Sequence, residues 1–226
     1  MVVQFDTVRH DSVFSDFNRR VDIIGCGATG SRVAMSLARL GVYELHLWDK
    51  DTVSDHNIAN QIFDLPDVGL NKVLALAIAI NRATKIEPII HEDFADSKSQ
   101  LGHVVFILTD TMQSRKDIFS GLKGKFGHEV VIETRMGIKE GRIYVINPMS
   151  PKQVDFWSKT LYNDDEAQES YCGSRIVVGA TADVLAGLSV WQFITWWNDI
   201  KKGDSTVFQE LIFGLYPFGF LTNKIV

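Results

Sequence analysis

The sequence predicts an α/β fold with a mostly parallel sheet, antiparallel strands towards its C-terminal end and helices on both faces. Three observations lead to this prediction. A short apolar strand at 21–24 runs directly into the glycine-rich loop GCGATG. A helical pattern over 33–40 follows this loop, and a second apolar run, Leu45–Trp48, follows the helix. Strand, loop, helix and strand in this order form a Rossmann-like βαβ unit, which is typical of a nucleotide site.

Each glycine of the loop has its own expected role. Gly25 allows the tight turn after the strand, Gly27 lets backbone N–H groups approach phosphate oxygens, and Gly30 lets the helix lie close to the sheet. Ala28 and Thr29 stand at the start of the helix, where free N–H groups and the positive end of the dipole face an anion. We therefore expect a phosphate-binding loop.

An acidic residue follows each of two apolar runs. Asp49 follows Leu45–Trp48, nineteen residues after Gly30, and is placed to accept hydrogen bonds from ribose hydroxyls. Asp110 follows Val104–Leu108, again at the carboxyl edge where open parallel sheets keep their ligand sites. The loop and Asp49 alone suit NAD as well as ATP, so an NAD-dependent oxidoreductase is an open alternative.

The rest of the chain continues the alternation of strands and helices. Periodicity predicts a well-buried helix over 70–80, which continues to 82, and another helix over 113–122. The other predicted strands are 89–91, 129–132, 132–135, 142–146, 208–213 and 218–221. The short turn at 137–141 requires antiparallel pairing of the strands beside it, so the sheet is mixed.

Two prolines, at 148 and 151, mark a change of character. Residues 152–171 are acidic and irregular around 163–166, which predicts an exposed loop. A strongly apolar helix then starts at Gly179 and carries Trp191, Trp196 and Trp197. Such a helix must be buried in the core or in a subunit contact, which favours a homodimer.

Composition narrows the function classes. We interpret the 226 residues as one domain, with a leader at 1–20 that packs loosely and a shortened crossover loop at 148–175. The net charge of −5 lacks the basic surface that nucleic acid requires. No apolar run reaches the ~18 residues of a membrane span. Two cysteines and no signal-like N-terminus fit a reducing compartment, so we expect a cytoplasmic protein.

Four separated motifs resemble the adenylating domain shared by ThiF, MoeB, HesA and the ubiquitin-activating enzymes. They are GCGATGSR, WDKDTVSDHNIANQ, the pair NK ending at Lys72, and LTD ending at Asp110. The resemblance covers residues 21–197, and RHDSVF and ETRMG are also similar to compact phage- or plasmid-encoded ThiF-like proteins. It implies ATP-dependent activation of a carboxylate as an acyl-adenylate, usually the C-terminus of a ubiquitin-like protein or peptide.

The same resemblance implies roles for single residues. The glycine loop would bind phosphates, Asp49 would hold the ribose, and Asp51 would lie beside it. Asn57 and Gln61 match polar contacts to ATP, and Lys72 matches a lysine that contacts the phosphates. These roles are implied by the family and not by the spacing of the residues.

Charge explains why such a site needs cations. A carboxylate and a triphosphate repel each other, so in-line attack at the α-phosphorus requires groups that neutralise the charge spreading in the transition state. Lys72 can supply one positive charge. Asp110 matches the aspartate that holds magnesium in the family, and a carboxylate suits this hard cation.

The chain departs from the family pattern at Asn60, which occupies the place of an arginine that contacts the phosphates. Asparagine carries no charge, so another arginine is needed if adenylation is to be fast. Arg9 from the partner subunit, Arg32 and Arg135 are the candidates, because guanidinium groups clamp phosphates well.

The cysteines also depart from the pattern. The paired Cys-X-X-Cys motifs of ThiF and MoeB are missing, so we expect no structural zinc. Cys172 is a candidate for a thioester besides Cys26, and the alternative is that both are small packing residues. Asn60 and the missing zinc cysteines also leave open a regulatory nucleotide-binding module without turnover.

Overall fold

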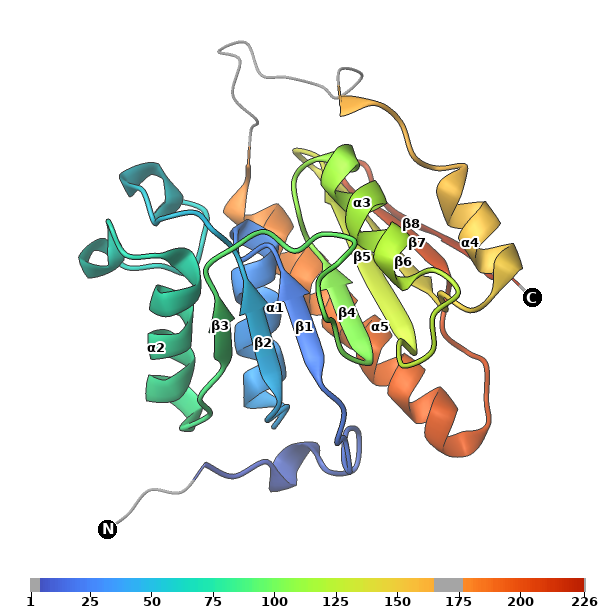
Figure 1. Cartoon of the computed structure of the whole chain (residues 1–226), viewed down its shortest axis with the longest axis horizontal. Coiled ribbons are helices and arrows are strands. Elements are labelled where there is room, and N and C mark those ends of the chain that lie inside the picture. The colour runs from blue at the N-terminus through green and yellow to red at the C-terminus, as the bar shows by residue number, and fades with distance from the viewer. Residues whose placement is uncertain (1–4, 165–176, 226) are drawn as a thin grey trace.

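An eight-stranded sheet in the order β3-β2-β1-β4-β5-β6-β7-β8 organises the chain (Figure 1). The computed structural model describes residues 5–164 and 177–225. The parallel strands are β1 (Val21–Ile24), β2 (Leu45–Trp48), β3 (Ile89–His91), β4 (Val104–Ile107) and β5 (Val130–Met136). The antiparallel additions are β6 (Glu140–Ile146), β7 (Glu210–Leu215) and β8 (Phe218–Asn223). The predicted mixed sheet is confirmed.

Helices cover both faces of this sheet, as predicted. On one face lie α1 (Ala28–Arg39), α2 (Lys72–Thr84) and α5 (Gly179–Lys202), and on the other α3 (Met112–Leu122) and α4 (Pro151–Ser158) (Figure 1). Short 3-10 turns are η1 (Val8–His10), η2 (Asp55–Asn57) and η3 (Leu65–Asp67). Side chains alternate along each strand, so Ile23 joins the core beneath α1 and Ile24 the core beneath α3.

Helix α4 is an element that the sequence analysis missed, because it predicted an irregular loop from residue 152. Ser150 caps this helix by accepting a hydrogen bond from the Gln153 N–H at 3.4 Å, and Pro151 occupies the first position. Val154 and Trp157 are buried against the sheet. Two apolar residues three apart are too short a pattern to predict a helix beside acidic neighbours.

The leader packs onto the domain more tightly than predicted. Phe14 is buried and lies 5.4 Å from the ring of Phe193, and Phe17 meets Trp197 edge to face at 5.1 Å. The indole N–H of Trp197 donates to the Ser15 carbonyl at 2.9 Å. The expectation of a loosely packed leader is therefore wrong for residues 13–17, because their aromatic rings complete the core at the end of α5.

Two helices are less completely buried than their composition suggests. The predicted well-buried helix α2 buries Val73, Leu76 and Ile80, but Leu74 and Ile78 are exposed, so its burial is confined to one side. On α5, Trp196 and Trp197 are buried, whereas Trp191 is 57% exposed. Within residues 5–164 and 177–225, no helix is long and apolar enough to cross a membrane.

A polar cluster lies on the sheet where β2 and β3 meet. Nδ1 of His46 lies 3.0 Å from Nε2 of His91, and Trp48 stacks on His91 with ring centroids 3.6 Å apart. One imidazole must donate and the other accept, so the accepting ring must be neutral and the two rings cannot both be protonated. Burial, followed by the positive charge of Arg20, lowers the pKa of both histidines.

The histidine pair predicts a loss of stability in acid. Because the pKa values of both histidines are lowered in the folded state, the unfolded chain binds more protons than the folded chain. The pair therefore stabilises the fold above pH ~6.5, the usual pKa of histidine. This contribution disappears as the pH falls through the lowered pKa values. Denaturant unfolding at pH 7.5, 6 and 5 should show a smaller pH dependence for His91→Gln than for the wild type. His56→Gln, at an exposed position in η2, should keep the wild-type dependence. The prediction is contradicted if the free energy of unfolding depends on pH equally in His91→Gln and in the wild type.

Candidate nucleotide site

The site starts where three parallel strands end together. The register aligns Ile24 of β1 with Trp48 of β2 and Ile107 of β4. The residues after these strands therefore share the carboxyl edge of the sheet, as expected for a ligand site in an open parallel sheet. The Gly25 N–H donates to the Trp48 carbonyl at 2.9 Å, which ties the glycine loop to the end of β2.

Two of the three loop glycines are required by close contacts. Gly25 has φ +92°, and a Cβ on it would lie 2.8 Å from the Leu108 carbonyl oxygen. A Cβ on Gly30 would lie 1.8 Å from the Gly25 carbonyl oxygen. The roles predicted for Gly25 in the turn and for Gly30 in helix packing agree with this geometry.

The space around Gly27, at the start of α1, is not filled by other residues that the structure describes. It is the N-cap residue and offers no side-chain cap, and a Cβ on it would meet only Gln61 Nε2 at 4.0 Å. The first turn, with Ala28 and Thr29, contains no acidic residue. Unpaired N–H groups and the positive end of the helix dipole therefore face this space, and they fit a phosphate group.

Asp49 is fixed beside the loop. Its carboxylate accepts the Cys26 N–H at 2.8 Å and the Asp51 N–H at 2.9 Å. Burial raises the pKa of Asp49, although these two bonds and the positive charge of Lys72 act in the opposite direction. Hydroxyl donors such as those of a ribose would satisfy the remaining lone pairs of a carboxylate held in this position.

The thiol of Cys26 is unsuited to nucleophilic chemistry. Its side chain is fully buried in the glycine loop, and burial together with the charge of Asp49 raises its pKa well above the usual range. Of the two readings of this cysteine, the structure supports the packing role. Cys172 lies outside the described residues.

Lys72 and Asp51 meet at the same edge. The Lys72 ammonium donates to the Asp51 carboxylate at 3.0 Å, and the Lys72 N–H donates to the Asp51 carbonyl at 2.9 Å. Asn71 caps α2 by accepting the Val73 N–H at 3.0 Å, which positions Lys72 in the first turn. The Lys72 side chain is 10% exposed and that of its acidic partner Asp51 is 56% exposed, so an incoming phosphate could compete with Asp51 for the ammonium.

The end of η2 and the residues after it carry three amide side chains. Asn57, the last residue of η2, is buried, and its side-chain Oδ1 accepts the Ser54 N–H at 2.9 Å and so closes a turn. The side-chain oxygens of Asn60 and Gln61 are buried without a hydrogen-bond partner among the described residues. Because buried polar atoms are almost always paired in folded proteins, these two fit a site that a ligand completes.

The three candidate arginines occupy different places. Arg32 lies beside Asn60, with its NH1 group 2.8 Å from the Asn60 carbonyl oxygen. Arg135 is buried and tied to Glu133. Arg9 belongs to η1, and the neighbouring Thr7 lies against Gly41, just after the end of α1 that points away from the glycine loop.

Asp110 lies exposed in the turn between β4 and α3. Thr111, and not Asp110, is the N-cap of α3 and accepts the Ser114 N–H at 3.2 Å. Arg115 fixes the turn, because its NH2 group donates to the carbonyl of Thr109 and, at 3.0 Å, to that of Thr134. The residue before Asp110 is thus tied to a buried arginine at the carboxyl edge.

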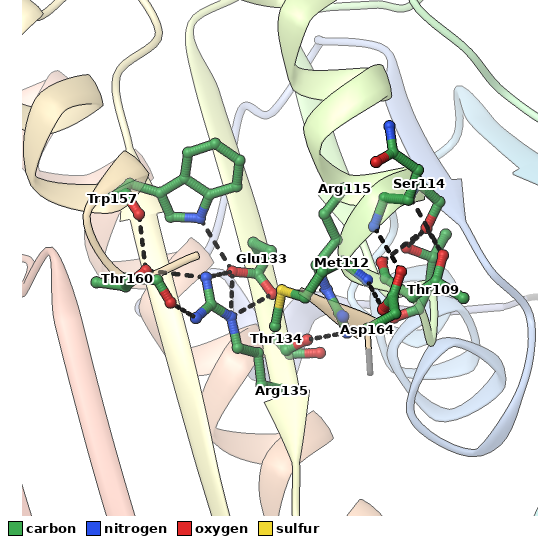
Figure 2. A network of polar contacts seen from close by, with 12 residues as sticks. Thr109, Met112, Ser114, Arg115, Glu133, Thr134, Arg135, Trp157, Thr160 and Asp164 are labelled. Carbon is green, nitrogen blue, oxygen red and sulfur yellow. Dashed lines mark hydrogen bonds and ion pairs between the residues drawn. The ribbon is translucent and has the colours of Figure 1, made fainter. Parts of the chain in front are cut away.

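Figure 2 shows the network behind this turn, which the sequence analysis did not find. Glu133 is fully buried on β5 and lies 2.8 Å from Arg115 Nε, 3.0 Å from Arg135 Nε and 3.0 Å from Trp157 Nε1. Arg135 also donates to the carbonyl of Thr160 at 2.7 Å. A glutamate inside the apolar run VVIETRM was the one available signal, because a buried acid must be paired.

The described residues hold no ready-made metal centre. In 5–164 and 177–225, no three His, Cys, Asp or Glu side chains gather closely enough to bind a metal ion. Magnesium is commonly held by one or two carboxylates together with substrate phosphates and waters. Asp110 therefore fits a magnesium ion that arrives with a nucleotide.

The glycine geometry predicts unequal effects of two alanine substitutions. Gly30→Ala should destabilise the fold by about 3 kcal/mol, because its Cβ would overlap the backbone of Gly25. Gly187→Ala, in the open interior of α5, should stabilise it by roughly 0.5–1 kcal/mol. Urea unfolding of both variants tests this, and a harmless Gly30→Ala would rule out the close helix contact.

The Glu133 network predicts a second asymmetry. Glu133→Gln should cost roughly 3–5 kcal/mol, because it leaves Arg115 and Arg135 buried without their anion. The matched control Asp155→Asn breaks the exposed pair with Lys159 and should cost less than about 1 kcal/mol. Equal losses in chemical unfolding would show that the network contributes no more than a surface pair.

Comparisons with known proteins agree with this architecture. A model of the ThiF family matches residues 3–212. Two relatives named "ATP-dependent ubiquitin transferase-like protein Cap2" are 35% identical, over 65 residues in Enterobacter hormaechei subsp. hoffmannii and over 72 in Vibrio cholerae. These matches cover 29% and 30% of this chain but only 11% and 12% of the relatives.

Solved structures share the fold over most of the chain. PaaA aligns with a TM-score of 0.69 at 21% identity, over 91% of this chain and 64% of its own. MccB from E. coli, with AMPCPP and MccA, aligns with a TM-score of 0.70 at 15% identity, over 92% of this chain and 64% of its own. At these identities the likeness shows the fold alone.

Proposed function

This chain belongs to the ThiF family, and from that membership and the site geometry we propose that it is an adenylyltransferase dependent on ATP and magnesium. Its substrate is a carboxylate, at the C-terminus of a ubiquitin-like protein or peptide. The observation that carries the proposal is the meeting of the glycine loop, Asp49 and the Asp51–Lys72 pair at one edge of the sheet. Asp110 follows β4 at the same edge.

The printed names of the relatives support the nucleotide and the class of substrate. Cap2 is described as ATP-dependent and ubiquitin transferase-like. MccB has been crystallised with ATP and with AMPCPP together with MccA. Because this chain spans about a tenth of Cap2 and 64% of MccB, the activity of the whole relatives comes to it as a proposal only.

In the proposed complex, the loop N–H groups bind phosphate oxygens and Asp49 accepts hydrogen bonds from the ribose. Asn57 and Gln61 line the nucleotide. Lys72 exchanges its ion pair with Asp51 for one with a phosphate, which brings the lysine's positive charge next to the reacting phosphate. Asp110 would hold magnesium, which supplies Lewis acidity to the phosphates when bound.

The proposed reaction transfers the adenylyl group of ATP to the carboxylate of the substrate. A carboxylate oxygen of the substrate attacks the α-phosphorus, and a new oxygen–phosphorus bond forms. The bond from the α-phosphorus to the bridging oxygen breaks, and pyrophosphate leaves with the electron pair. The products are the acyl-adenylate and pyrophosphate, and no redox partner is required.

The proposal includes a homodimer of single-domain subunits. Trp191 on α5 is 57% exposed, and tryptophan is among the residues enriched at protein interfaces. The turn that carries Arg9 lies near the end of α1 away from the glycine loop of its own chain, so a role of Arg9 at the phosphates would place it in the partner's site. Light scattering would give the mass of two chains.

Two observations favour a regulatory module that binds nucleotide without turnover. Asn60 brings no charge to the phosphates, and Lys72 is already engaged by Asp51. If both conditions persist with ATP bound, the charge that builds up in the transition state is poorly neutralised.

Pyrophosphate exchange tests the proposal. Wild-type protein, ATP, magnesium and peptides that end in a free glycine carboxylate should exchange labelled pyrophosphate into ATP. Asp110→Ala and Lys72→Ala should each lower the exchange rate by at least about 100-fold. Asp55→Ala, at an exposed position in η2, is the matched control and should retain it.

The other outcomes separate the alternatives. ATP binding by calorimetry without exchange for any peptide supports the regulatory module. NAD binding tighter than ATP binding supports an oxidoreductase. Absence of any nucleotide binding contradicts all three functions.

A further inference from the structure

Arg32 joins three parts of the chain at the rim of the nucleotide site. From the second turn of α1, its side chain runs back to the start of the helix, where NH1 donates to the carbonyls of Ala28 at 2.9 Å and Asn60 at 2.8 Å. Its Nε group donates to the carboxylate of Asp183 on α5. The Arg32 side chain is only 15% exposed.

Two helices begin at this guanidinium. The start of α5 lies beside the start of α1, as Figure 1 shows and the Arg32–Asp183 contact requires. A Cβ on Gly179, the first residue of α5, would lie 3.5 Å from Arg32 NH2. Neither helix has an acidic residue in its first turn, and neither has a side-chain cap among the described residues.

This arrangement concentrates positive charge. Each helix N-terminus acts as about half a positive charge, and Arg32 adds a full one. The acid in contact with Arg32 is Asp183, whose side chain is 64% exposed and therefore well screened by water. A cation placed at the positive ends of two helices is unfavourable unless an anion arrives to balance it.

We infer that Arg32 is a specificity-determining residue of the nucleotide site, which keeps a positive charge beside the phosphates and makes the site prefer a triphosphate over an uncharged nucleoside. The inference rests on the proposed ATP site. Arg32 thereby places a guanidinium next to Asn60, whose own side chain is uncharged. Asp183 balances this charge while the site is empty of anions and competes with the phosphates for it.

The variants must distinguish an effect of the positive charge of Arg32 from an effect of its hydrogen bonds to the backbone. Arg32→Ala removes the charge and the contacts to Ala28 and Asn60. Arg32→Lys keeps the charge but loses the planar fork that reaches several acceptors at once. Asp183→Asn keeps the guanidinium and removes its acidic competitor. Arg39→Ala, in the last turn of α1, is the matched control at the far end of the same helix.

Calorimetry with ATP and with adenosine, without any acceptor peptide, gives the readout. Arg32→Ala should raise the Kd for ATP at least about 10-fold and change the Kd for adenosine less than about 2-fold. Arg32→Lys should recover most of the ATP affinity. Asp183→Asn should bind ATP as tightly as wild type or tighter, and Arg39→Ala should match wild type for both ligands.

A purely structural role for Arg32 gives a different pattern. In that case Arg32→Lys resembles Arg32→Ala, and Asp183→Asn weakens ATP binding because a support is lost. The inference is overturned if Arg32→Ala binds ATP and adenosine equally more weakly, or if its affinity for ATP is unchanged. In either case, ATP binding by the wild type leaves the proposed function standing. If Arg32→Ala does not fold, the Arg32→Lys and Asp183→Asn results still decide. Wild type that binds no ATP overturns both.

Discussion

The contact between Gly30 and the carbonyl of Gly25 holds the start of α1 against the sheet. A Cβ at Gly30 would lie 1.8 Å from that oxygen, so the approach is possible only without a side chain. The same Cβ would lie 3.5 Å from the Leu108 side chain, so the start of α1 lies beside the residues that follow β1 and β4. The proposed phosphate site, the position of Asp49 and the neighbourhood of Arg32 all depend on this short distance.

Around that contact, the polar side chains are supported by one another. Asp49 is fixed by backbone N–H groups of the loop, and Lys72 is held by Asp51. Asp110 stands on a turn fixed by Arg115, which in turn meets the buried Glu133. Asp49 and the turn before α3 are therefore fixed in advance, whereas Lys72 has to exchange Asp51 for a phosphate in the proposed complex.

Several features that local patterns could not predict lie in packing between distant segments. Helix α4 has only Val154 and Trp157 to indicate its buried face. The leader docks through Phe14 and Phe17 onto aromatic rings near the end of the chain. A pattern within one window carries no information on which partner a side chain meets more than a hundred residues away.

The sequence by itself determined the mixed α/β sheet, the glycine loop and the position of Asp49 after β2. These depend on strand and helix periods and on backbone freedom at glycine, which act between near neighbours in the chain. Only the tertiary structure decided that Arg32 lies against Asn60 and Asp183, that Arg135 is tied to Glu133, and that the turn carrying Arg9 lies near the end of α1 away from the loop. The three arginines carry the same charge, so the sequence could not distinguish them. Their surroundings differ because the elements that carry them pack against different parts of the chain.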